Sequence, residues 1–416
     1  MSEKLLTYDE ASLLVAQRAG KLVAQKPRTE RVPLAAAAGR VLALALAADS
    51  DQPAFARSTR DGYACRAAEI NAHQPLPIAG SIRAGDPLPP ALPAGSVWEI
   101  MTGAPIPAGA DAVAMFEHMK KTRKGVQLLA PRTLKQGENI VAQAAQARKG
   151  DCLLAAGAVL DFAQIALAAS CGQSKLSVYA RPRVAILTTG DEVIAVEAKP
   201  GPGKIRNSNA PMLAAMVAAA GGEPWVLPTA GDNLKALVRA LKQVCKADLV
   251  LVTGGVSAGK FDLVEPALKE LGARFPFTGV RIQPGKPTVF AEIPKSKREE
   301  RGKTPCFGLP GNPVSSAVTF LLFAAPVLAA LAGRAEVGPR FALARLDAGP
   351  YRHAKSALTR FLPALCDFAI EEPTVGFVPW QGSGDLAALA RSNCFIVLPP
   401  EGKPLKPGAL VRILIA

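Results

Sequence analysis

The chain has 416 residues, a formal net charge of +15 at pH 7 and 49% hydrophobic side chains. That length exceeds one ordinary hydrophobic core, so we expect two to four domains. Only 5% of the residues are aromatic, and no aromatic cluster interleaves with the basic residues, which argues against a nucleic-acid-binding protein. The positive charge instead favours a small anionic ligand.

The cysteines, the histidines and the N-terminal sequence limit which metal or disulfide sites the protein can have and where it is located. The seven cysteines lack a C-x-x-C pair and are odd in number, which argues against a disulfide framework or a zinc ribbon. The three histidines lie far apart, so we expect no histidine-rich metal centre. The start MSEKLLTYDEASLL has no signal-peptide pattern. We expect no run of about 18 uncharged apolar residues elsewhere, and therefore a cytoplasmic location.

The first half of the chain predicts a helical element with an insertion. A first helix should follow Thr7, because TYDE has the spacing of a capping box. From 49 to 148, short apolar stretches cut by prolines and glycines predict a small, mainly β module. A second helix should begin at Asp161 and pack beside the first. Residues 1–48 and 149–176 would then form a helical linker domain.

The second half predicts a multidomain α/β organisation. From 177 to 332, strand and helix patterns alternate, which predicts a doubly wound, largely parallel α/β domain. After Gly333, short strands and turns return as far as VRILIA, which predicts a C-terminal β domain over 333–416.

Three loops follow predicted strands of the α/β domain: TTGDEV (188–193), TGGVSAGKFD (253–262) and GLPGNPVSS (308–316). Because the carboxyl ends of parallel strands lie along one edge, we expect these loops to face one crevice. Their glycines either bring backbone N–H groups close to a phosphate or only supply positive φ in tight turns. Acidic residues follow the strands at Asp191, Glu192, Asp232 and Asp262. They suit Mg²⁺ bridging to phosphates, or they form a solvated rim.

Two further segments of this domain suit an anion. PGKP holds Lys286 between prolines, which suits a fixed positive charge on a phosphate. Asn312 and Pro313 fit the start of a helix near Val314. The N-terminus of that helix is a second candidate anion site.

Nine motifs occur in one order along the chain: RDGYA, IMTGAPIPAGADAV, GEN, TTGDEV, IRNSNAPML, TGGVSAGKFD, PGKP, GLPGNPVSS and QGSG. Together they resemble the molybdopterin molybdenumtransferase family, which includes the bacterial MoeA proteins and the gephyrin E domain, over nearly the whole chain. The resemblance implies a split helical linker domain, an inserted β domain, a molybdopterin-binding α/β domain and a C-terminal β-barrel-like domain. It also implies a homodimer, with each active site between the inserted domain of one subunit and the α/β and C-terminal domains of the other.

The resemblance further implies a reaction and its residues. Adenylylated molybdopterin and molybdate would be the substrates, AMP would be released with the help of Mg²⁺, and molybdenum would remain on the dithiolene. The catalytic residues that it implies are Asp61, Glu192, Asp232 and Asp262, and the metal ligands are Asp61, Asp191, Glu192 and Asp262. The substrate-binding residues that it implies are Thr102, Thr189, Gly254, Gly255, Ser257, Lys286, Pro310, Asn312, Pro313, Ser315 and Arg360. Molybdopterin adenylyltransferase and molybdoenzyme apo-proteins or their chaperones are the suggested partners, with no nucleic acid and no membrane.

The chain departs from the family pattern at three places. Ala144-Ala145-Gln146 stands where the family usually has GED, Arg60 replaces an apolar residue, and Gln283 replaces a basic one. A lost carboxylate weakens metal binding, whereas Arg60 would favour an anion and keep Asp61 ionised. Two functions stay open: a retained transferase, and a non-catalytic or divergent protein that binds molybdopterin or the molybdenum cofactor or serves as a scaffold. The flanking segments argue against the adenylyltransferase, which uses the α/β domain alone.

Overall fold

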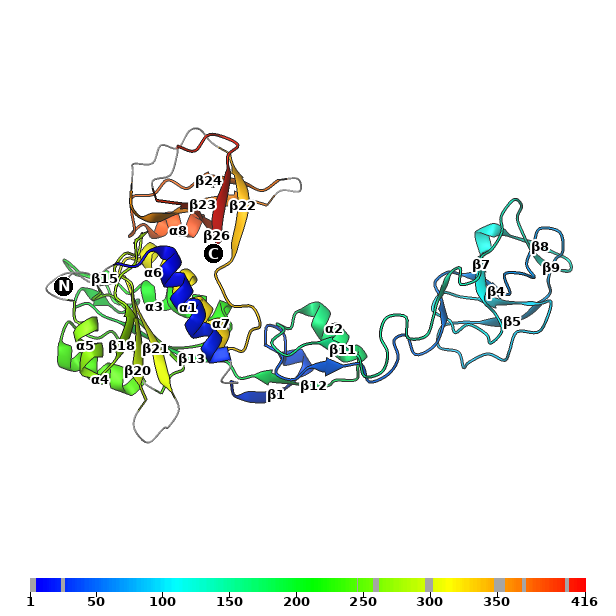
Figure 1. The fold of residues 1–416 in the computed structure, drawn as a ribbon, viewed down its shortest axis with the longest axis horizontal. Helices are drawn as coiled ribbons and strands as arrows, with labels where there is room; N and C mark the ends of the chain where they lie inside the picture. Colours follow the sequence, from blue (N-terminus) through cyan, green and yellow to red (C-terminus); the bar gives the residue numbers. More distant parts are fainter. Residues whose placement is uncertain are drawn as a thin grey trace.

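The computed structural model describes residues 5–23, 27–244, 246–256, 262–295, 302–347, 356–368, 372–400 and 404–416. The molecule is elongated, with the α/β domain and the C-terminal barrel at one end and the inserted module at the other (Figure 1). A slender linker joins the two ends, so the inserted module lies far from the α/β domain of its own chain.

A six-stranded sheet forms the centre of the α/β domain. In spatial order its strands are β16 (Glu223–Val226), β13 (Arg183–Thr188), β17 (Leu249–Thr253), β21 (Lys303–Leu309), β20 (Val289–Pro294) and β18 (Arg274–Phe277). The first four pair in parallel, and β20 and β18 add an antiparallel edge. Every residue of β17 is buried, as its unbroken apolar run predicts.

Helices cover both faces of this sheet, which confirms the doubly wound prediction. The helices on one face are α3 (Asn209–Ala219), α6 (Pro313–Thr319), the π-helical turn η3 (Phe320–Ala324) and α7 (Ala325–Leu331). Those on the other face are α4 (Leu234–Val244) and α5 (Val264–Glu270). Each face has its own buried apolar core, and a close-packed core on both sides fixes the positions of the strand ends. A short parallel pair, β14 (Val193–Ile194) and β15 (Ile205–Arg206), lies in the connection from β13 to α3.

Both predicted helix caps form. Ahead of α1 (Tyr8–Val23), the Thr7 N–H donates to Glu10 Oε2 (2.7 Å) and the Glu10 N–H donates to Thr7 Oγ1 (3.2 Å). Ahead of α2 (Phe162–Ser170), the Asp161 carboxylate accepts from two backbone N–H groups of the first turn. These side chains satisfy donors that a helix start otherwise leaves unpaired.

The expectation that the first two helices pack together is wrong. Helix α1 packs against α7, and Tyr8, Ala11 and Val15 join a core of the α/β domain. The ring of Tyr8 meets that of Phe361 edge-on at a centroid distance of 5.6 Å. The three- and four-residue spacing predicts the apolar stripe of α1, but it does not say which neighbour the stripe meets.

Within the described residues, one helical stretch, Pro313–Leu331, is long and apolar enough to cross a membrane by length and composition. It contradicts the expectation that the chain holds no such run. Most of the stretch is buried in the α/β domain, where it contacts α1, α3 and β21. A helix that is surrounded by a protein core needs the same apolar composition as one in a bilayer, so burial accounts for this stretch.

The linker is built from both flanks of the insertion. Its elements besides α2 are β1 (Thr29–Pro33), the 3₁₀ turn η1 (Leu34–Ala36), β2 (Leu46–Ala47), β11 (Cys152–Leu154) and β12 (Lys175–Tyr179). Strand β1 pairs with β12 and β2 pairs with β11, so each pair joins the two flanks. The linker therefore contains more strand than the predicted helical domain would, because α1 packs in the α/β domain instead.

The inserted module is made of strands, as its prolines and glycines predict. Its elements are β3 (Arg57–Ser58), β4 (Gly62–Cys65), β5 (Ile78–Ile82), β6 (Val97–Ile100), β7 (Ala112–Met115), the 3₁₀ turn η2 (Phe116–His118), β8 (Met119–Thr122), β9 (Gly125–Leu128) and β10 (Ile140–Val141). The central sheet has the order β5-β6-β4-β7.

The C-terminal domain is a closed barrel of five strands. Its elements are β22 (Phe341–Leu346), β23 (Thr359–Asp367), β24 (Thr374–Phe377), α8 (Leu386–Arg391), β25 (Cys394–Leu398) and β26 (Leu410–Ile415). The barrel closes because β25 pairs with both β26 and β23. Strand β19 (Ile282–Gln283) of the α/β segment pairs with β23, so the sheet of the barrel reaches into the neighbouring domain.

Candidate active site

A cavity of about 1170 Å³ lies where the carboxyl ends of the parallel strands face the C-terminal barrel. The loops that follow β13, β17 and β21 line it, together with residues 282–287 and the barrel segment that begins at Trp380. The three loops that we expected at one crevice therefore do meet there.

Most of the predicted site residues line this cavity: Thr189, Glu192, Asp232, Gly254, Gly255, Asp262, Lys286, Pro310, Asn312, Pro313 and Ser315. Two more predicted site residues contact or pair with residues that line the cavity. Asp191 hydrogen-bonds with Asp232, and Arg360 on β23 is the register partner of Gln283 on β19. Ser257 lies outside the described residues.

Close packing of the loops requires the two glycines after β17. Gly254 and Gly255 have φ values of +94° and +62°. A Cβ on Gly254 would lie 2.6 Å from the Thr189 carbonyl oxygen, and one on Gly255 would lie 3.0 Å from Thr189 Oγ1. The Gly254 N–H already donates to the Leu309 carbonyl oxygen (3.2 Å). The tight-turn explanation therefore holds for both glycines, and a phosphate here would need N–H groups beyond Gly254.

The acidic rim is formed by two loops that hold each other in place. The Asp191 N–H donates to Asp232 Oδ2 (3.3 Å), and the Asp232 N–H donates to Asp191 Oδ1 (3.0 Å). Lys204 Nζ donates to the Asp191 carbonyl oxygen (2.7 Å). A Cβ on Gly190 would lie 2.7 Å from Glu192 Oε2, so this glycine makes room for the Glu192 carboxylate. The hydrogen bonds between Asp191 and Asp232 fix the two loops relative to each other.

Asn207 ties two neighbouring strands to a helix, a role that the sequence did not reveal. Its Nδ2 donates to Thr188 Oγ1 (3.2 Å) at the end of β13 and to Thr229 Oγ1 (3.3 Å) beyond β16. Its Oδ1 accepts from the Ala210 N–H (3.0 Å) in the first turn of α3. Asn207 therefore both bonds the first turn of α3, from the position before its N-cap Ser208, and fixes the spacing of two strand ends.

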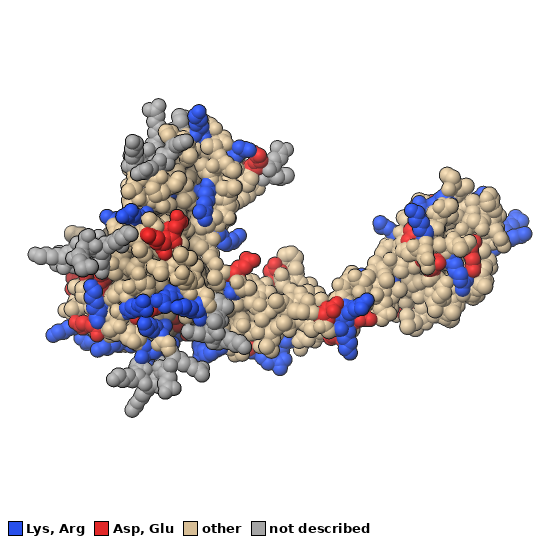
Figure 2. Space-filling model, in the orientation of Figure 1, with Lys and Arg blue, Asp and Glu red and all other residues tan. Residues whose placement is uncertain are grey.

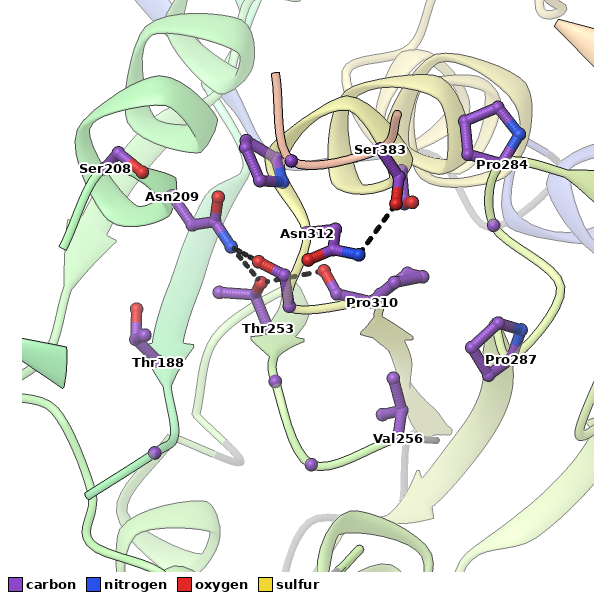
Figure 3. Close-up of a pocket in the computed structure, with 18 of the residues that line it drawn as sticks. Thr188, Ser208, Asn209, Thr253, Val256, Pro284, Pro287, Pro310, Asn312 and Ser383 are labelled. Atoms are coloured by element: carbon purple, nitrogen blue, oxygen red, sulfur yellow. Dashed lines mark hydrogen bonds between the residues drawn. The ribbon is translucent and has the colours of Figure 1, made fainter. Parts of the chain in front are cut away.

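Asn209 likewise joins the ends of the other two parallel strands (Figure 3). Its Nδ2 donates to Thr253 Oγ1 (2.9 Å) at the end of β17 and to the Gly311 carbonyl oxygen (2.6 Å) beyond β21. Its Oδ1 is buried with no hydrogen-bond partner. Because the strand order is β16-β13-β17-β21, Asn207 and Asn209 together span all four carboxyl ends. The sequence signal was the motif IRNSNAPML, which contains both asparagines but does not say what they bond.

The barrel contacts the start of α6 directly. Asn312 Nδ2 donates to Ser383 Oγ (2.7 Å), and the Val314 N–H donates to the Ser383 carbonyl oxygen (3.0 Å) (Figure 3). Asn312 and Pro313 do start the helix, although the Asn312 side chain caps nothing in it. One N–H of the predicted anion site is therefore already used by the barrel.

Asp61 and Thr102 form a separate polar site in the inserted module, at the far end of the molecule (Figure 1). Asp61 Oδ1 accepts from the Thr102 N–H (2.6 Å) and from Thr102 Oγ1 (2.8 Å). The Thr102 N–H, and then the Thr102 hydroxyl, hold the pKa of Asp61 below its ordinary value. Thr102, rather than Arg60, therefore keeps Asp61 ionised, which corrects the expectation from the sequence.

Three family models match successive parts of the chain. The MoeA N-terminal region (domain I and II) matches residues 6–172, the probable molybdopterin binding domain 185–330, and the MoeA C-terminal region (domain IV) 346–415. The molybdopterin molybdenumtransferase of Nostoc sp. is 36% identical, with 93% of this chain and 88% of that protein covered. That of Haemophilus influenzae is 33% identical, with 98% of each covered. The chain belongs to the molybdopterin molybdenumtransferase family.

Solved structures of the family share this fold. The molybdopterin biosynthesis MoeA protein of Pyrococcus horikoshii has a TM-score of 0.79 and 27% identity, with 99% of this chain and 100% of that chain covered. A second structure described as a molybdopterin biosynthesis MoeA protein from the same species has a TM-score of 0.74 and 29% identity, with 99% of each chain covered. The resemblance that the nine motifs carry and the multidomain α/β fold that it implies are both confirmed.

Mg²⁺, which the family resemblance implies, fits the acidic rim only together with a bound ligand. Within the described ranges, no group of three or more His, Cys, Asp or Glu side chains is arranged to hold a metal ion. Mg²⁺ commonly binds through one or two carboxylates, with waters and substrate phosphates completing its shell. Glu192, Asp232 and Asp262 line the cavity and are the carboxylates that would hold it.

The departure from the family's GED motif lies where the inserted module returns to the linker. The Ala144 N–H donates to the Pro53 carbonyl oxygen (3.0 Å), and the Gln146 N–H donates to the Gln52 carbonyl oxygen (2.8 Å). Ala144 has a φ of 58°, a value that favours glycine. The backbone thus keeps a glycine-type turn at this place although the chain has alanine there.

Proposed function

We propose that this chain is a molybdopterin molybdenumtransferase, which takes adenylylated molybdopterin and molybdate and releases AMP while molybdenum is left on the pterin dithiolene. The observation that carries the proposal is the cavity, which gathers the three predicted loops, the acidic rim and Lys286 in one space. A non-catalytic scaffold would not need these groups to converge, and the curated relatives carry the transferase name.

The cavity residues fit the steps of such a reaction. Lys286 supplies a positive charge for a phosphate or molybdate oxygen. Asp232 and Glu192 would hold Mg²⁺ against the substrate phosphates, where the ion would supply electrostatic stabilisation as the bond between the pterin phosphate and AMP breaks. The braced loops keep these groups in place before the substrate arrives, so little reorganisation is needed.

The charge of the whole chain supports an anionic substrate. The formal net charge is +15, and Lys and Arg side chains are spread over every part of the face shown, with a dense group over the α/β domain (Figure 2). A positive field raises the local concentration of polyanions and speeds their encounter.

We further propose a homodimer in which the Asp61–Thr102 pair of one subunit completes the cavity of the other. Its support is the distance between the two parts within one chain (Figure 1). A cytoplasmic location, Mg²⁺ dependence and exchange with an adenylyltransferase and with apo-enzymes or their chaperones belong to the same proposal.

The test is AMP release from the purified chain with adenylylated molybdopterin, Mg²⁺ and molybdate. We expect release that requires molybdate, stops with a chelator and falls about 10²–10³-fold in Asp262→Asn. Asp367→Asn, at the exposed end of β23, is the matched control and should keep full activity. Tight substrate binding without AMP release would replace the transferase with a binding role.

A further inference from the structure

We propose that Trp380 is a stacking platform for a planar heteroaromatic ring at the barrel end of the cavity, an assignment that rests on the proposed function. Of the aromatic side chains that the structure describes, Trp380 is the one that lines the cavity. It is half-buried and packs on the apolar cores of both the α/β domain and the barrel. Packing therefore fixes one part of the indole while another part faces the cavity.

The lining of the cavity combines apolar and polar groups. Its apolar side chains from β19, the segment after it and the barrel are Ile282, Pro284, Leu358 and Leu386. Leu386 is 41% exposed, so it presents apolar surface that the protein does not cover. Polar groups come from the loops after the parallel strands, such as Glu192 and Asp232, and from Lys286 and Ser383. This mixed lining suits a ligand that carries both a flat ring and phosphates.

The segment that carries Trp380 is held in a fixed conformation. Asp385 Oδ2 accepts from the Gln381 N–H (3.0 Å), and Asp385 Oδ1 accepts from the Ala388 N–H (2.9 Å) in α8. The Asp385 N–H donates back to the Gly382 carbonyl oxygen (3.0 Å). A platform that is already ordered loses little conformational freedom when a ring binds, so more of the stacking energy appears as affinity.

The indole also has a free polar edge. No hydrogen bond from Trp380 Nε1 to another described residue exists, and this atom is not among the buried polar atoms without a partner. It therefore remains available to solvent or ligand. A fused heteroaromatic ring can stack on the indole face, while water or another polar group of the same ligand can accept the hydrogen bond from the in-plane N–H. Adenylylated molybdopterin contains two rings of this class, a pterin and an adenine.

The experiment measures the binding of each ring by calorimetry, with AMP in one arm and 6-hydroxymethylpterin in the other. The variants are Trp380→Ala and Trp380→Phe, with Trp225→Ala as a matched control. Trp225 lies under Arg183 at 4.0 Å in the α/β domain, outside the cavity. For at least one ligand, we expect Trp380→Ala to weaken binding about tenfold or more, and Trp380→Phe and Trp225→Ala to change it less than about threefold. The ligand that responds identifies the ring.

A spectroscopic measurement keeps Trp380 itself intact. The chain has three tryptophans, so Trp98→Phe combined with Trp225→Phe leaves Trp380 as the only indole emitter. We expect saturable quenching of its emission by AMP if adenine is the ring, and quenching by the pterin alone if the pterin is.

Two results would overturn the proposal: no binding of either ligand to the wild type, or binding that Trp380→Ala leaves unchanged. Molybdate-dependent AMP release is measured separately. A wild type that releases AMP while Trp380→Ala keeps its KM overturns the ring platform alone. Ring binding that depends on Trp380 in a protein without AMP release overturns the transferase alone.

Discussion

The cavity of the α/β domain and the Asp61–Thr102 site of the inserted module are built in opposite ways. The cavity is backed by buried side chains, such as Asn209, Thr253 and Ser316, that bond across several strands. The Asp61 carboxylate, by contrast, is exposed, and among the described residues its hydrogen bonds come from Thr102. The chain's own fold brings the cavity loops together, whereas the second site leaves its carboxylate exposed to solvent.

This difference shows which part of the site depends on folding and which on association. Side chains that bridge four strands of one sheet need only a folded subunit. A carboxylate at the end of a long linker contributes to chemistry only if another surface meets it (Figure 1). Symmetric homodimers commonly meet that need, because each subunit can complete the other's site.

The largest effect is expected when two inactive variants are mixed, which tests whether the two sites work together across subunits. Asp61→Ala and Lys286→Ala should each lose AMP release, because one removes the module's carboxylate and the other removes a cation that lines the cavity. Co-expressed in equal amounts, half of the dimers are mixed, and each mixed dimer has one intact site of two. About a quarter of the wild-type activity should therefore return. Activity that stays absent in the mixture, while each variant alone still folds and dimerises, would rule out a shared site.

A second variant tests the strand bridges inside the cavity. Asn209→Ala removes the donor to Thr253 and Gly311, and should lower the free energy of unfolding by about 1–3 kcal/mol and kcat about tenfold or more. Asn393→Ala is matched, because the Asn393 side chain also makes two hydrogen bonds, but in the barrel and both to Cys366, at its N–H and its carbonyl oxygen (2.8 Å each). It should cost similar stability and leave kcat unchanged. Equal kcat in both variants would reduce Asn209 to a structural residue.

The sequence predicts the scaffold of the cavity well because its signals are local. Apolar runs predict β13 and β17, the cap residues predict α1 and α2, and the position of the three loops after parallel strands predicts that they face one crevice. Prediction from the sequence fails for contacts between residues that are far apart in the chain. The apolar stripe of α1 does not indicate that its partner is α7. The side chains of Asn207 and Asn209 do not indicate which strands they bridge. The role of Thr102 in ionising Asp61 is likewise a tertiary contact.

A smaller effect concerns the charge of the module's carboxylate. Thr102→Val removes the hydroxyl donor but keeps the backbone N–H, which is the larger cause of the lowered pKa. The pKa of Asp61 should therefore rise only part of the way towards its ordinary value of 3.8. Because the folded pKa is depressed, the stability from this contact is present above the unfolded pKa and is lost as pH falls through the folded one. Carboxyl carbon shifts in an NMR titration measure it, with Thr122→Val in the same module as control. An unchanged Asp61 titration would contradict the hydrogen bond.

The smallest effect lies at the junction between the two regions. Ala144 occupies a left-handed conformation that costs an alanine about 1–2 kcal/mol, whereas glycine adopts it freely but loses more entropy on folding. Ala144→Gly should therefore raise the free energy of unfolding by about 0.5–1 kcal/mol, measured by urea denaturation. Ala145→Gly, the next residue and one with negative φ, should lower it by a similar amount. If the first change raises stability without changing AMP release, the turn serves only to hold the module on its linker. If AMP release changes as well, the orientation of the module affects the reaction. A site that is completed between two subunits requires such an effect.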